Sequence, residues 1–380
     1  MGGGVENNVM TSAASRTARP DPCGVLLVAN LPDGPLVGGV EVGVEMILTS
    51  DLKARHAMHL FNTARRRDPS RSLRERLGYQ LGRCVELARD IVQRRPKLVH
   101  VKATVGVNYW QGACYSIIAR ALRKPTLLQL HGGDLDAWYL EHGRLGRFGI
   151  RMCLRVPSEV IVLSEYWRSF VAGLAPRQKI RVVPNGVRVD LAEPRTRGAE
   201  RDLRIVTLGA LGTRKGHFEI LDAIAQLPAE GLRFVFAGED EFGGEEAALR
   251  ARAAELGVAD RVELVGAVTG RAKWRLLADA DVFLLPSRGE NMPNAVLEAM
   301  AAGLPVVCTS VGALPEMLDV GAIFVPTNDA AAIAAAIREV AGDPERRTAM
   351  GRANRERAHS RFAFSAIAAT LDGLYRESAR

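Results

Sequence analysis

The sequence predicts an α/β protein built from two doubly wound domains that face each other, and three observations support this fold class. Its 380 residues suit two domains, because a domain usually has ~100–200 residues. Short apolar runs, typical of buried parallel strands, alternate with amphipathic segments along the chain. These runs form two successive series, separated by a stretch that has turn residues and charge but no periodicity.

The apolar runs define the predicted strands. In the first series the strands are Val25–Ala29, Leu98–Val101, Thr126–Leu130, Val160–Leu163 and Ile180–Val183. The amphipathic segments between them are Val40–Ser50, Leu73–Gln93 and Trp110–Arg123. In the second series the strands are Arg204–Leu208, Phe234–Ala237, Val262–Val265, Val282–Leu285, Pro305–Cys308 and Ala322–Val325.

These patterns divide the chain into five parts. Residues 1–20 are rich in Gly, Ser, Ala and Arg and are expected to be a disordered leader, since they lack the apolar stretch of a signal peptide. The remaining parts are a first domain at 21–186, a linker at 187–200, a second domain at 201–345 and a helical tail at 346–380.

The cysteines and the hydropathy pattern limit the class of protein. Five cysteines are scattered without a CxxC pair, so we expect reduced thiols in a cytoplasmic protein and neither a disulfide framework nor a zinc site. No run approaches the ~18 apolar residues that a membrane-spanning helix needs.

The charge is unevenly distributed. Residues 1–190 carry 28 Lys and Arg against 16 Asp and Glu, whereas the second half is slightly acidic. The basic excess is concentrated between Lys53 and Lys97, and it includes Arg65, Arg66, Arg67, Arg71, Arg74, Arg76, Arg94 and Arg95. Such a patch suits anionic lipid headgroups, a diphosphate-linked ligand or nucleic acid. An Arg-rich, solvated helix face remains an equally open interpretation.

The strongest local signal is the segment 286–305, PSRGENMPNAVLEAMAAGLP. An apolar strand runs into a loop and then into a helix expected to begin near Pro293, because proline is favoured in the first helical turn. The N–H groups and the positive dipole end of such a helix suit a phosphate group. Glu290 precedes this point and Glu298 follows it. A carboxylate beside a phosphate is repelled by it, so both are expected to accept hydrogen bonds from sugar or ribose hydroxyls.

Glu290, seven residues, Glu298 and then Ala-Met-Ala-Ala-Gly-Leu-Pro resemble the donor-site signature of the retaining glycosyltransferases of family four. Further motifs follow in the family's order over nearly the whole chain past residue 24. They are Gly38-Gly39-Val40, His131-Gly132-Gly133-Asp134, Leu163-Ser164-Glu165, Val183-Pro184-Asn185-Gly186-Val187, Leu208-Gly209-Ala210-Leu211 with Arg214-Lys215-Gly216, Phe236-Ala237-Gly238, Val265-Gly266 and Gly321 followed by Pro326. The resemblance implies the GT-B fold. Two Rossmann-like domains would face each other, with the acceptor on 21–186, the nucleotide-sugar on 201–345, and a C-terminal helix that packs back on the N-terminal domain.

The resemblance also implies roles for individual residues. Lys215, with Arg214, would neutralise the donor diphosphate, and Glu298 would hold the ribose. The candidate catalytic residues are Glu290, at the transferred sugar, and His131, near the anomeric carbon. Donor binding would further involve Gly39, Gly238, Asn291, Met292, Pro293 and Asn294. The family often has Arg where this chain has Ala210, and Arg214 is the candidate replacement.

The predicted chemistry is a retaining glycosyl transfer without a metal ion or cofactor. Negative charge develops on the departing diphosphate, and fixed cations and helix N–H groups would stabilise it. Retention, with the leaving phosphate as base, is implied by the resemblance. Asp134-Leu-Asp136 and Asp279-Ala-Asp281 imitate a metal-binding DxD motif, but neither is expected to hold a cation. His100 and His217 are expected to be structural.

The expected partners are a nucleotide-sugar donor and a glycan or lipid-diphosphate-linked acceptor, with a possible anionic membrane surface at the inner face of the plasma membrane. Lipopolysaccharide or exopolysaccharide synthesis would use such an enzyme. Nucleic acid is not expected as a partner, because the sequence has no recognisable nucleic-acid-binding pattern. Two alternatives stay open: a catalytically silent sugar-nucleotide-binding protein, and a phosphorylase-like or epimerase-like enzyme on the same scaffold.

Overall fold

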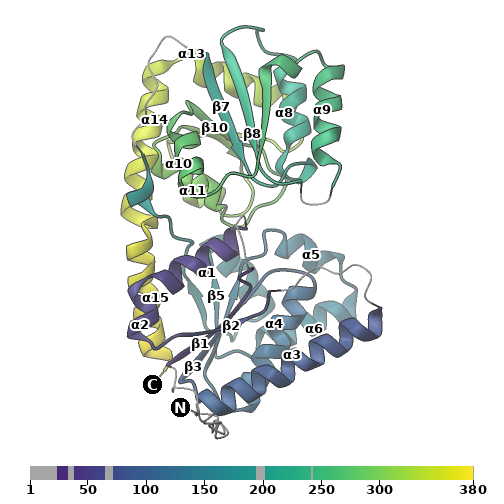
Figure 1. The fold of residues 1–380 in the computed structure, drawn as a ribbon, viewed down its shortest axis with the longest axis vertical. Coiled ribbons are helices and arrows are strands. Elements are labelled where there is room, and N and C mark those ends of the chain that lie inside the picture. The colour runs from purple at the N-terminus through teal and green to yellow at the C-terminus, as the bar shows by residue number, and fades with distance from the viewer. Residues whose placement is uncertain (1–23, 33–37, 65–71, 194–201, 241–242, 380) are drawn as a thin grey trace, which may run out of the picture.

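The computed structural model of the protein describes residues 24–32, 38–64, 72–193, 202–240 and 243–379. Within them lie two parallel six-stranded sheets, one above the other along the long axis of the molecule, each flanked by helices (Figure 1). The predicted fold class, two facing doubly wound domains, is confirmed. The expected leader at 1–20 and residues 194–200 of the expected linker lie outside the described residues.

The N-terminal sheet has the strand order β2-β1-β3-β4-β5-β6, with every neighbouring pair parallel. Parallel neighbours require crossover connections, and the helices in these connections cover both faces of the sheet. Apolar side chains of α3, α4, α6 and α7 pack on one face, and those of α1 and α2 on the other. The elements are β1 (Val25–Ala29), α1 (Gly39–Thr49), α2 (Asp51–Arg55), β2 (His59–Asn62), α3 (Leu73–Arg94), β3 (Leu98–Ala103), α4 (Val107–Ala121), β4 (Thr126–Leu130), α5 (Leu135–Glu141), α6 (Arg144–Leu154), β5 (Glu159–Val162), α7 (Glu165–Leu174) and β6 (Ile180–Val182).

The C-terminal sheet has the order β12-β11-β10-β7-β8-β9 and is also parallel throughout. Its central strands β7 and β10 are almost wholly apolar and buried, as strands covered on both faces must be. The elements are η1 (Val189–Leu191), β7 (Leu203–Leu208), η2 (Thr213–Lys215), α8 (His217–Ile224), β8 (Leu232–Ala237), α9 (Glu245–Glu255), η3 (Ala259–Arg261), β9 (Val262–Gly266), α10 (Gly270–Ala278), β10 (Val282–Leu285), α11 (Asn294–Ala301), β11 (Val306–Thr309), α12 (Leu314–Met317), β12 (Ala322–Val325) and α13 (Ala330–Gly342).

The end of the chain runs along both domains and joins them (Figure 1). Helix α14 (Pro344–Arg357) packs on the C-terminal domain, a π-helical turn, η4 (Ala358–Phe362), follows it, and α15 (Phe364–Ser378) reaches the N-terminal domain. Ile367, Leu371 and Tyr375 of α15 are buried among the side chains of β1 and α1. The expected return of the C-terminal helix to the N-terminal domain is therefore confirmed.

The structure differs from the sequence prediction at two places that affect the argument. Strand β2 was not predicted, because it is a short edge strand whose residues, His59 to Asn62, are mixed in polarity and only partly buried. Pro293 was expected in the first helical turn, but its ψ of 122° is extended, so it caps the helix and α11 begins at Asn294.

The described cysteines and helices bear on the composition and hydropathy of the chain. Cys84, Cys114, Cys153 and Cys308 are free thiols. None of the helices within the described residues combines the length and the apolarity needed to cross a lipid bilayer.

Candidate active site

A cleft of about 560 Å³ lies where the carboxyl ends of the two sheets face each other. Open parallel sheets bind ligands beyond the carboxyl ends of their strands, where the connecting loops gather. The structure brings all eleven predicted site residues to the lining of this cleft. They are Gly39, His131, Arg214, Lys215, Gly238, Glu290, Asn291, Met292, Pro293, Asn294 and Glu298.

The loop that follows β10 forms one wall of the cleft and is held tightly in place. The Thr309 hydroxyl donates a hydrogen bond of 2.6 Å to the Ser287 carbonyl. Gly312 has a φ of 56°, and a Cβ at this position would lie 1.9 Å from the carbonyl oxygen of Glu290. Only glycine fits so close to another backbone, and this close approach fixes the position of Glu290.

Two side-chain amides of the same wall connect it to the N-terminal domain. The Asn291 amide donates to the carbonyl of Gly132 at 3.1 Å, next to His131. The Asn294 amide, in the first turn of α11, donates to the carbonyl of Gly39 at 3.0 Å. The start of α11 therefore faces directly across the cleft to the loops of the other domain.

Lys215 and Glu290 form an ion pair at the centre of the cleft. Both side chains are largely buried, with exposed fractions of 11% and 7%. The Ser287 hydroxyl donates to the same oxygen, Glu290 Oε1, at 2.8 Å. Lys215 follows β7 through the 3-10 turn η2, and the turn ends at Gly216, whose φ of 78° favours glycine.

Arg214 extends from the same turn and is exposed. Its guanidinium acts electrostatically on the Asp134 carboxyl in the opposite domain, where it lowers the pKa. Burial has the larger effect, and the pKa of Asp134 is raised overall. Arg214 thus adds positive charge to the same region as Lys215, opposite the loop of His131.

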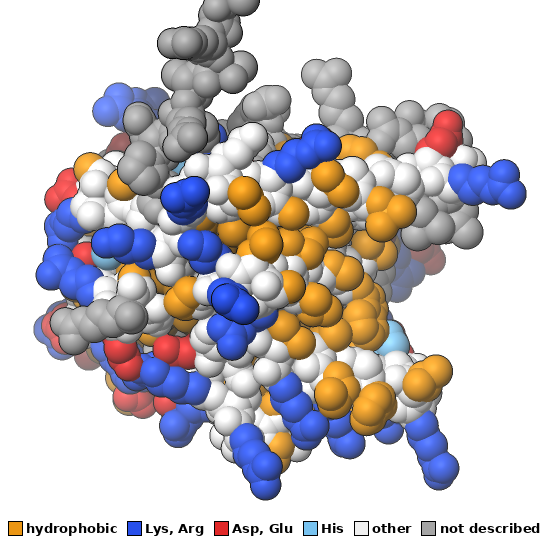
Figure 2. Space-filling model, turned by 90° about the horizontal axis from the view of Figure 1, so that it is seen from below, with side chains coloured by type: hydrophobic (Ala, Val, Ile, Leu, Met, Phe, Trp, Pro, Cys, Tyr) orange, Lys and Arg blue, Asp and Glu red, His pale blue; other side chains and the backbone are white. Residues whose placement is uncertain are grey.

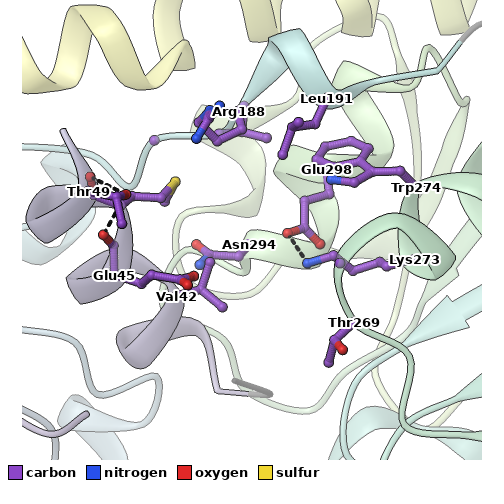
Figure 3. A pocket seen from close by; sticks show the side chains of 14 residues that line it. Val42, Glu45, Thr49, Arg188, Leu191, Thr269, Lys273, Trp274, Asn294 and Glu298 are labelled. Atoms are coloured by element: carbon purple, nitrogen blue, oxygen red, sulfur yellow. Dashed lines mark hydrogen bonds and ion pairs between the residues drawn. The ribbon is translucent and has the colours of Figure 1, made fainter. Parts of the chain in front are cut away.

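Glu298 is buried in α11 and pairs with Lys273 of α10, at 2.5 Å between Nζ and Oε1. Figure 3 shows the two side chains pointing toward each other across the gap between their helices. Burial raises the pKa of Glu298, and the nearby Lys273 ammonium opposes this rise. A second cavity, of about 490 Å³, adjoins this pair and extends to Thr49 of α1 and to Arg188.

His131, at the end of β4, contacts Lys102 of the neighbouring strand β3, with 3.3 Å between the His131 Nε2 and the Lys102 Nζ. Burial lowers the pKa of Lys102 to about 7. Burial and the Lys102 charge lower the pKa of His131 well below its ordinary value, so the imidazole is neutral at neutral pH. A protonated Lys102 can only donate, and the ring proton of His131 then lies on Nδ1.

Two glycines bring the ends of β7 and β8 together at the far side of the cleft. A Cβ on Gly238 would lie 1.8 Å from the carbonyl oxygen of Gly209, so the backbones are in direct contact. The Gly238 N–H donates to the Gly266 carbonyl at 2.9 Å. The adjoining lining residues Ala267 and Val268 are small and apolar, which suits the face of a ring.

The acidic pairs that imitate a metal motif have other partners. Asp136 accepts a hydrogen bond of 2.7 Å from the Tyr166 hydroxyl. Asp281 accepts one of 2.8 Å from the backbone N–H of Arg204 at the start of β7. Within the described part of the chain, no group of three or more His, Cys, Asp or Glu side chains is placed to hold a metal ion.

His100 and His217 are fully buried away from the cleft lining. His100 Nδ1 lies 2.8 Å from the Tyr375 hydroxyl of α15, and burial lowers the pKa of His100 to about 3. His217 contacts the carbonyl of Gly212 at 3.2 Å. Both make packing contacts, in agreement with the expected structural role.

Comparison with known families covers most of the chain. A family model described as "Glycosyltransferase Family 4" matches residues 37–191, and one described as "Glycosyl transferases group 1" matches residues 192–357. The chain belongs to this glycosyltransferase family. The family resemblance inferred from the Glu290–Glu298 signature is thereby confirmed.

Individual relatives share part of the sequence or the whole fold with this chain. The putative colanic acid biosynthesis glycosyltransferase WcaL of Escherichia coli (strain K12) is 33% identical over 185 residues, which cover 46% of this chain and 45% of WcaL. The chain spans about half the length of the first curated relatives that it matches. Sucrose-phosphate synthase from Thermosynechococcus elongatus has the same fold, with a TM-score of 0.78 at 21% identity over 93% of this chain and 98% of that one. Anabaena HepE in complex with UDP-glucose has a TM-score of 0.74 at 17% identity, over 93% and 99% of the two chains.

Sequence reasoning missed Lys273, which lines the cleft, and Lys102, which contacts the lining residue His131. Lys273 lies on α10 without a motif around it, and Lys102 lies near the end of a buried strand. Only the positions of these two lysines in the chain could have indicated them. Each lies near the carboxyl end of a parallel strand or in the segment after one, where ligand sites of open parallel sheets form. Their partners, Glu298 and His131, are far away in the sequence.

Proposed function

We propose that this chain transfers a sugar from a nucleoside diphosphate sugar to a hydroxyl group of a glycan or lipid-linked glycan, with retention of configuration and without a metal ion. The observation that carries the proposal is the Lys215–Glu290 pair, which lies in the cleft between the start of α11 and the loop of His131. A cation for phosphate and a carboxylate for hydroxyls are thereby adjacent. The UDP-glucose held by HepE, a protein of the same fold, supports a donor of this class.

The donor would lie along the C-terminal wall of the cleft. Its diphosphate would face Lys215, Arg214 and the N–H groups at the start of α11, where a positive dipole end favours an anion. The ribose hydroxyls would donate to Glu298. The base would lie toward Gly238 and Val268, where the lining is apolar.

The sugar would then lie between Glu290 and His131. The bond between the anomeric carbon and the phosphate oxygen breaks, and both electrons leave with the diphosphate. Lys215 and the helix N–H groups stabilise the charge on the leaving oxygens, and these groups are already fixed in place by packing. The acceptor hydroxyl attacks from the same face and gives its proton to the departing phosphate oxygen.

The neutral state of His131 suits this chemistry. A neutral imidazole does not repel the positive charge that develops on the sugar, whereas an imidazolium would. With its proton on Nδ1, the ring can donate a hydrogen bond to a sugar hydroxyl while Lys102 holds Nε2. Glu290 accepts hydroxyl hydrogen bonds on the same sugar and opposes the charge of Lys215.

The acceptor would bind on the N-terminal domain, and we propose a lipid-diphosphate-linked glycan at the cytoplasmic face of the membrane. The basic excess of the first half of the chain favours an acceptor with phosphate groups. WcaL, a relative named for colanic acid biosynthesis, belongs to the same class of polysaccharide assembly.

The experiment that tests this function is a panel of nucleotide sugars with one protein preparation. Thermal unfolding identifies the preferred donor, since a ligand present at 100 times its Kd adds ~2.7 kcal/mol of stability. Nuclear magnetic resonance of the product then gives the anomeric configuration. Inversion would contradict the proposal, binding without transfer to any glycan would favour a silent sugar-nucleotide-binding protein, and cleavage that needs inorganic phosphate would favour a phosphorylase.

A further inference from the structure

Helix α6 of the N-terminal domain presents an apolar stripe to solvent. Leu145, Phe148 and Met152 follow each other at helical spacing, and all three are exposed, with 83% of Leu145 and 59% of Phe148 accessible. Arg144, Arg147 and Arg151 each come directly before one of these three residues, and no residue of this helix is acidic. The inner side of α6 is anchored by Ile150 and Leu154, which are buried.

The stripe continues across α4 and α3. The Gln111 amide of α4 donates a hydrogen bond of 3.0 Å to Gln80 of α3, and the Tyr109 hydroxyl of α4 donates one of 2.9 Å to the Ile150 carbonyl of α6, so the three helices lie side by side with α4 in the middle. Ile117 of α4 and Leu81, Val85 and Val92 of α3 are exposed on these helices. Figure 2 views this end of the molecule and shows a field of apolar side chains with Lys and Arg around it.

Exposed apolar side chains are gathered here and not spread over the molecule. Among the described residues, thirteen large hydrophobic side chains are exposed, and nine of them lie on α3 to α6. These nine are Leu81, Val85, Val92, Val107, Ile117, Leu140, Leu145, Phe148 and Met152. A contiguous patch of this kind marks an interaction surface. We call these nine residues the apolar face.

Most of the exposed charges beside the apolar face are positive, although Glu86 of α3 and Glu141 of α5 are also exposed there. Arg120, Arg123, Arg144, Arg151 and Arg155 are exposed beside it. In the part of the chain that the structure describes, none of these five guanidinium groups forms an ion pair with a carboxylate. They are therefore available to an external anionic group.

We propose that the apolar face inserts into the headgroup region of an anionic lipid bilayer, with the surrounding arginines on the lipid phosphates. An apolar stripe flanked by basic side chains fits the boundary between acyl chains and headgroups. A second copy of the chain fits less well, because a two-fold interface through this face would place the unpaired arginines opposite each other. Nucleic acid offers phosphates but no apolar layer for Leu145 and Phe148.

The position of the apolar face relative to the cleft gives the contact a consequence. Thr104, His131 and Asp134 line the cleft. Val107 lies three residues after Thr104, and helices α5 and α6 follow the loop of His131 and Asp134. The part of the apolar face formed by Val107 and Leu140 would thus be the part nearest the acceptor side of the cleft, whereas Figure 2 shows the face from the end that points away from the C-terminal domain. This consequence rests on the proposed function, whereas the membrane contact itself does not depend on it.

The test is cosedimentation of the full chain with vesicles, without donor or acceptor. We expect binding to vesicles of phosphatidylcholine with phosphatidylglycerol and much weaker binding to phosphatidylcholine alone. Binding should fall as salt shortens the Debye length from ~10 Å at 0.1 M toward ~3 Å at 1 M. Nucleotide-sugar binding, measured by calorimetry without vesicles, reports on the proposed function separately.

Two double variants separate the apolar and the charged contributions. Leu145→Gln/Phe148→Gln should reduce vesicle affinity at least tenfold, because burial of these side chains drives insertion. Arg144→Gln/Arg151→Gln should reduce it about fivefold per arginine. The matched controls lie on the C-terminal domain: Val320→Gln removes an exposed apolar side chain, and Arg352→Gln/Arg355→Gln removes the same charge from α14. Both controls should bind vesicles as the wild type does.

Three outcomes would overturn the proposal. Wild-type protein that binds neither kind of vesicle has no such membrane contact. Equal losses in the test variants and the controls, with unchanged thermal unfolding, would place the contact elsewhere. A dimer in light scattering that Leu145→Gln/Phe148→Gln converts to a monomer, without vesicle binding, would assign the apolar face to a second copy of this chain.

Discussion

Lys215 and Glu290, which are 75 residues apart in the sequence, form a largely buried ion pair in the centre of the cleft. In the proposed placement of the donor, Lys215 would contact the diphosphate and Glu290 would contact the transferred sugar. A buried charge without its partner is costly, commonly ~3–5 kcal/mol. The pair therefore holds both side chains in place before the donor binds, which is the preorganisation that electrostatic catalysis requires.

The two members of this pair should respond differently to substitution. Lys215→Met should weaken nucleoside diphosphate binding roughly 10–100-fold, because a hydrogen bond to a charged group contributes ~1.5–3 kcal/mol. Glu290→Gln should bind the diphosphate at least as tightly as the wild type, because Lys215 loses a competing partner. Calorimetric titration measures both effects.

A matched control guards against a general loss of stability. Lys179→Met also removes a lysine from a buried carboxylate, that of Glu159. This pair lies outside the cleft, beside the edge strand β6 of the N-terminal sheet. It should lower the stability and leave the diphosphate affinity unchanged. Equal losses of affinity in Lys179→Met and Lys215→Met would remove Lys215 from the phosphate site.

The Lys273–Glu298 pair predicts a pH dependence of nucleotide binding. In the proposed placement of the donor, the ribose hydroxyls would donate to the ionised carboxylate of Glu298, and Lys273 is the group that lowers the pKa of Glu298 against the effect of burial. In Lys273→Met the pKa of Glu298 should rise further. Affinity for the nucleoside diphosphate should then be lost at a higher pH than in the wild type as the solution is acidified.

Calorimetry from about pH 8 to about pH 5 covers the range in which a raised carboxyl pKa would titrate. Lys273→Arg keeps the positive charge and should retain the wild-type profile. Superimposable profiles for the wild type and Lys273→Met would show that Glu298 does not act as a carboxylate on the ribose.

Lys102 should act on transfer through His131. Its pKa of about 7 means that it loses its charge near neutral pH. Because the protonated form holds Nε2 of His131 as an acceptor, kcat/KM should decline as the pH rises through this value. Lys102→Met should have a lower kcat/KM without this inflection, and Lys102→Arg should restore part of the activity.

The nuclear magnetic resonance chemical shifts of the two His131 ring nitrogens show which nitrogen carries the proton, independently of the kinetics. In the wild type the proton should lie on Nδ1, and in Lys102→Met the two tautomers should mix. If the chemical shifts of the His131 ring nitrogens are the same in the wild type and in Lys102→Met, Lys102 does not position the His131 ring.

Transfer should survive an excess of EDTA. In the proposed function, Lys215, Arg214 and the start of α11 would supply the positive charge that a divalent cation provides in other phosphate-leaving-group enzymes. The measurement is the rate of product formation before and after chelation. Complete loss of activity, restored by Mg²⁺ or Mn²⁺, would instead assign a cation to the region of Asp134 and Asp136.

Burial explains how much of the fold was predictable. Strands β1, β4 and β10 have the predicted bounds, because a strand covered on both faces is a largely apolar run. Strand β12 lies at the edge of its sheet, but its four residues are all apolar and its bounds were also predicted. Strand β2 gives no such signal, since it lies at the edge of the sheet and its residues are only partly buried. Helices α14 and α15 at the end of the chain were recognisable as helical from the sequence. The family resemblance implied that the C-terminal helix, α15, packs on the N-terminal domain.

The site was predictable where a local motif marks it. Glu290, Glu298 and Lys215 are surrounded by glycines and prolines whose backbone requirements leave a pattern in the sequence, as Gly216 and Gly312 illustrate. Lys273 and Lys102 leave none, because each is defined by a partner that only tertiary structure brings near. The ion pairs and the apolar face could for the same reason be found only in three dimensions.

The central claim is that the cleft holds the ribose at Glu298 and the transferred sugar at Glu290. The most direct measurement compares Glu290→Gln and Glu298→Gln by calorimetric titration with the nucleoside diphosphate and by single-turnover transfer from the preferred nucleotide sugar. Glu298→Gln should weaken binding of the diphosphate and of the nucleotide sugar alike. Glu290→Gln should leave diphosphate binding intact and lose its activity in the transfer step, because its contact strengthens as the sugar gains positive charge. If Glu290→Gln abolishes diphosphate binding while Glu298→Gln spares it, the donor lies in the opposite orientation and the account is wrong.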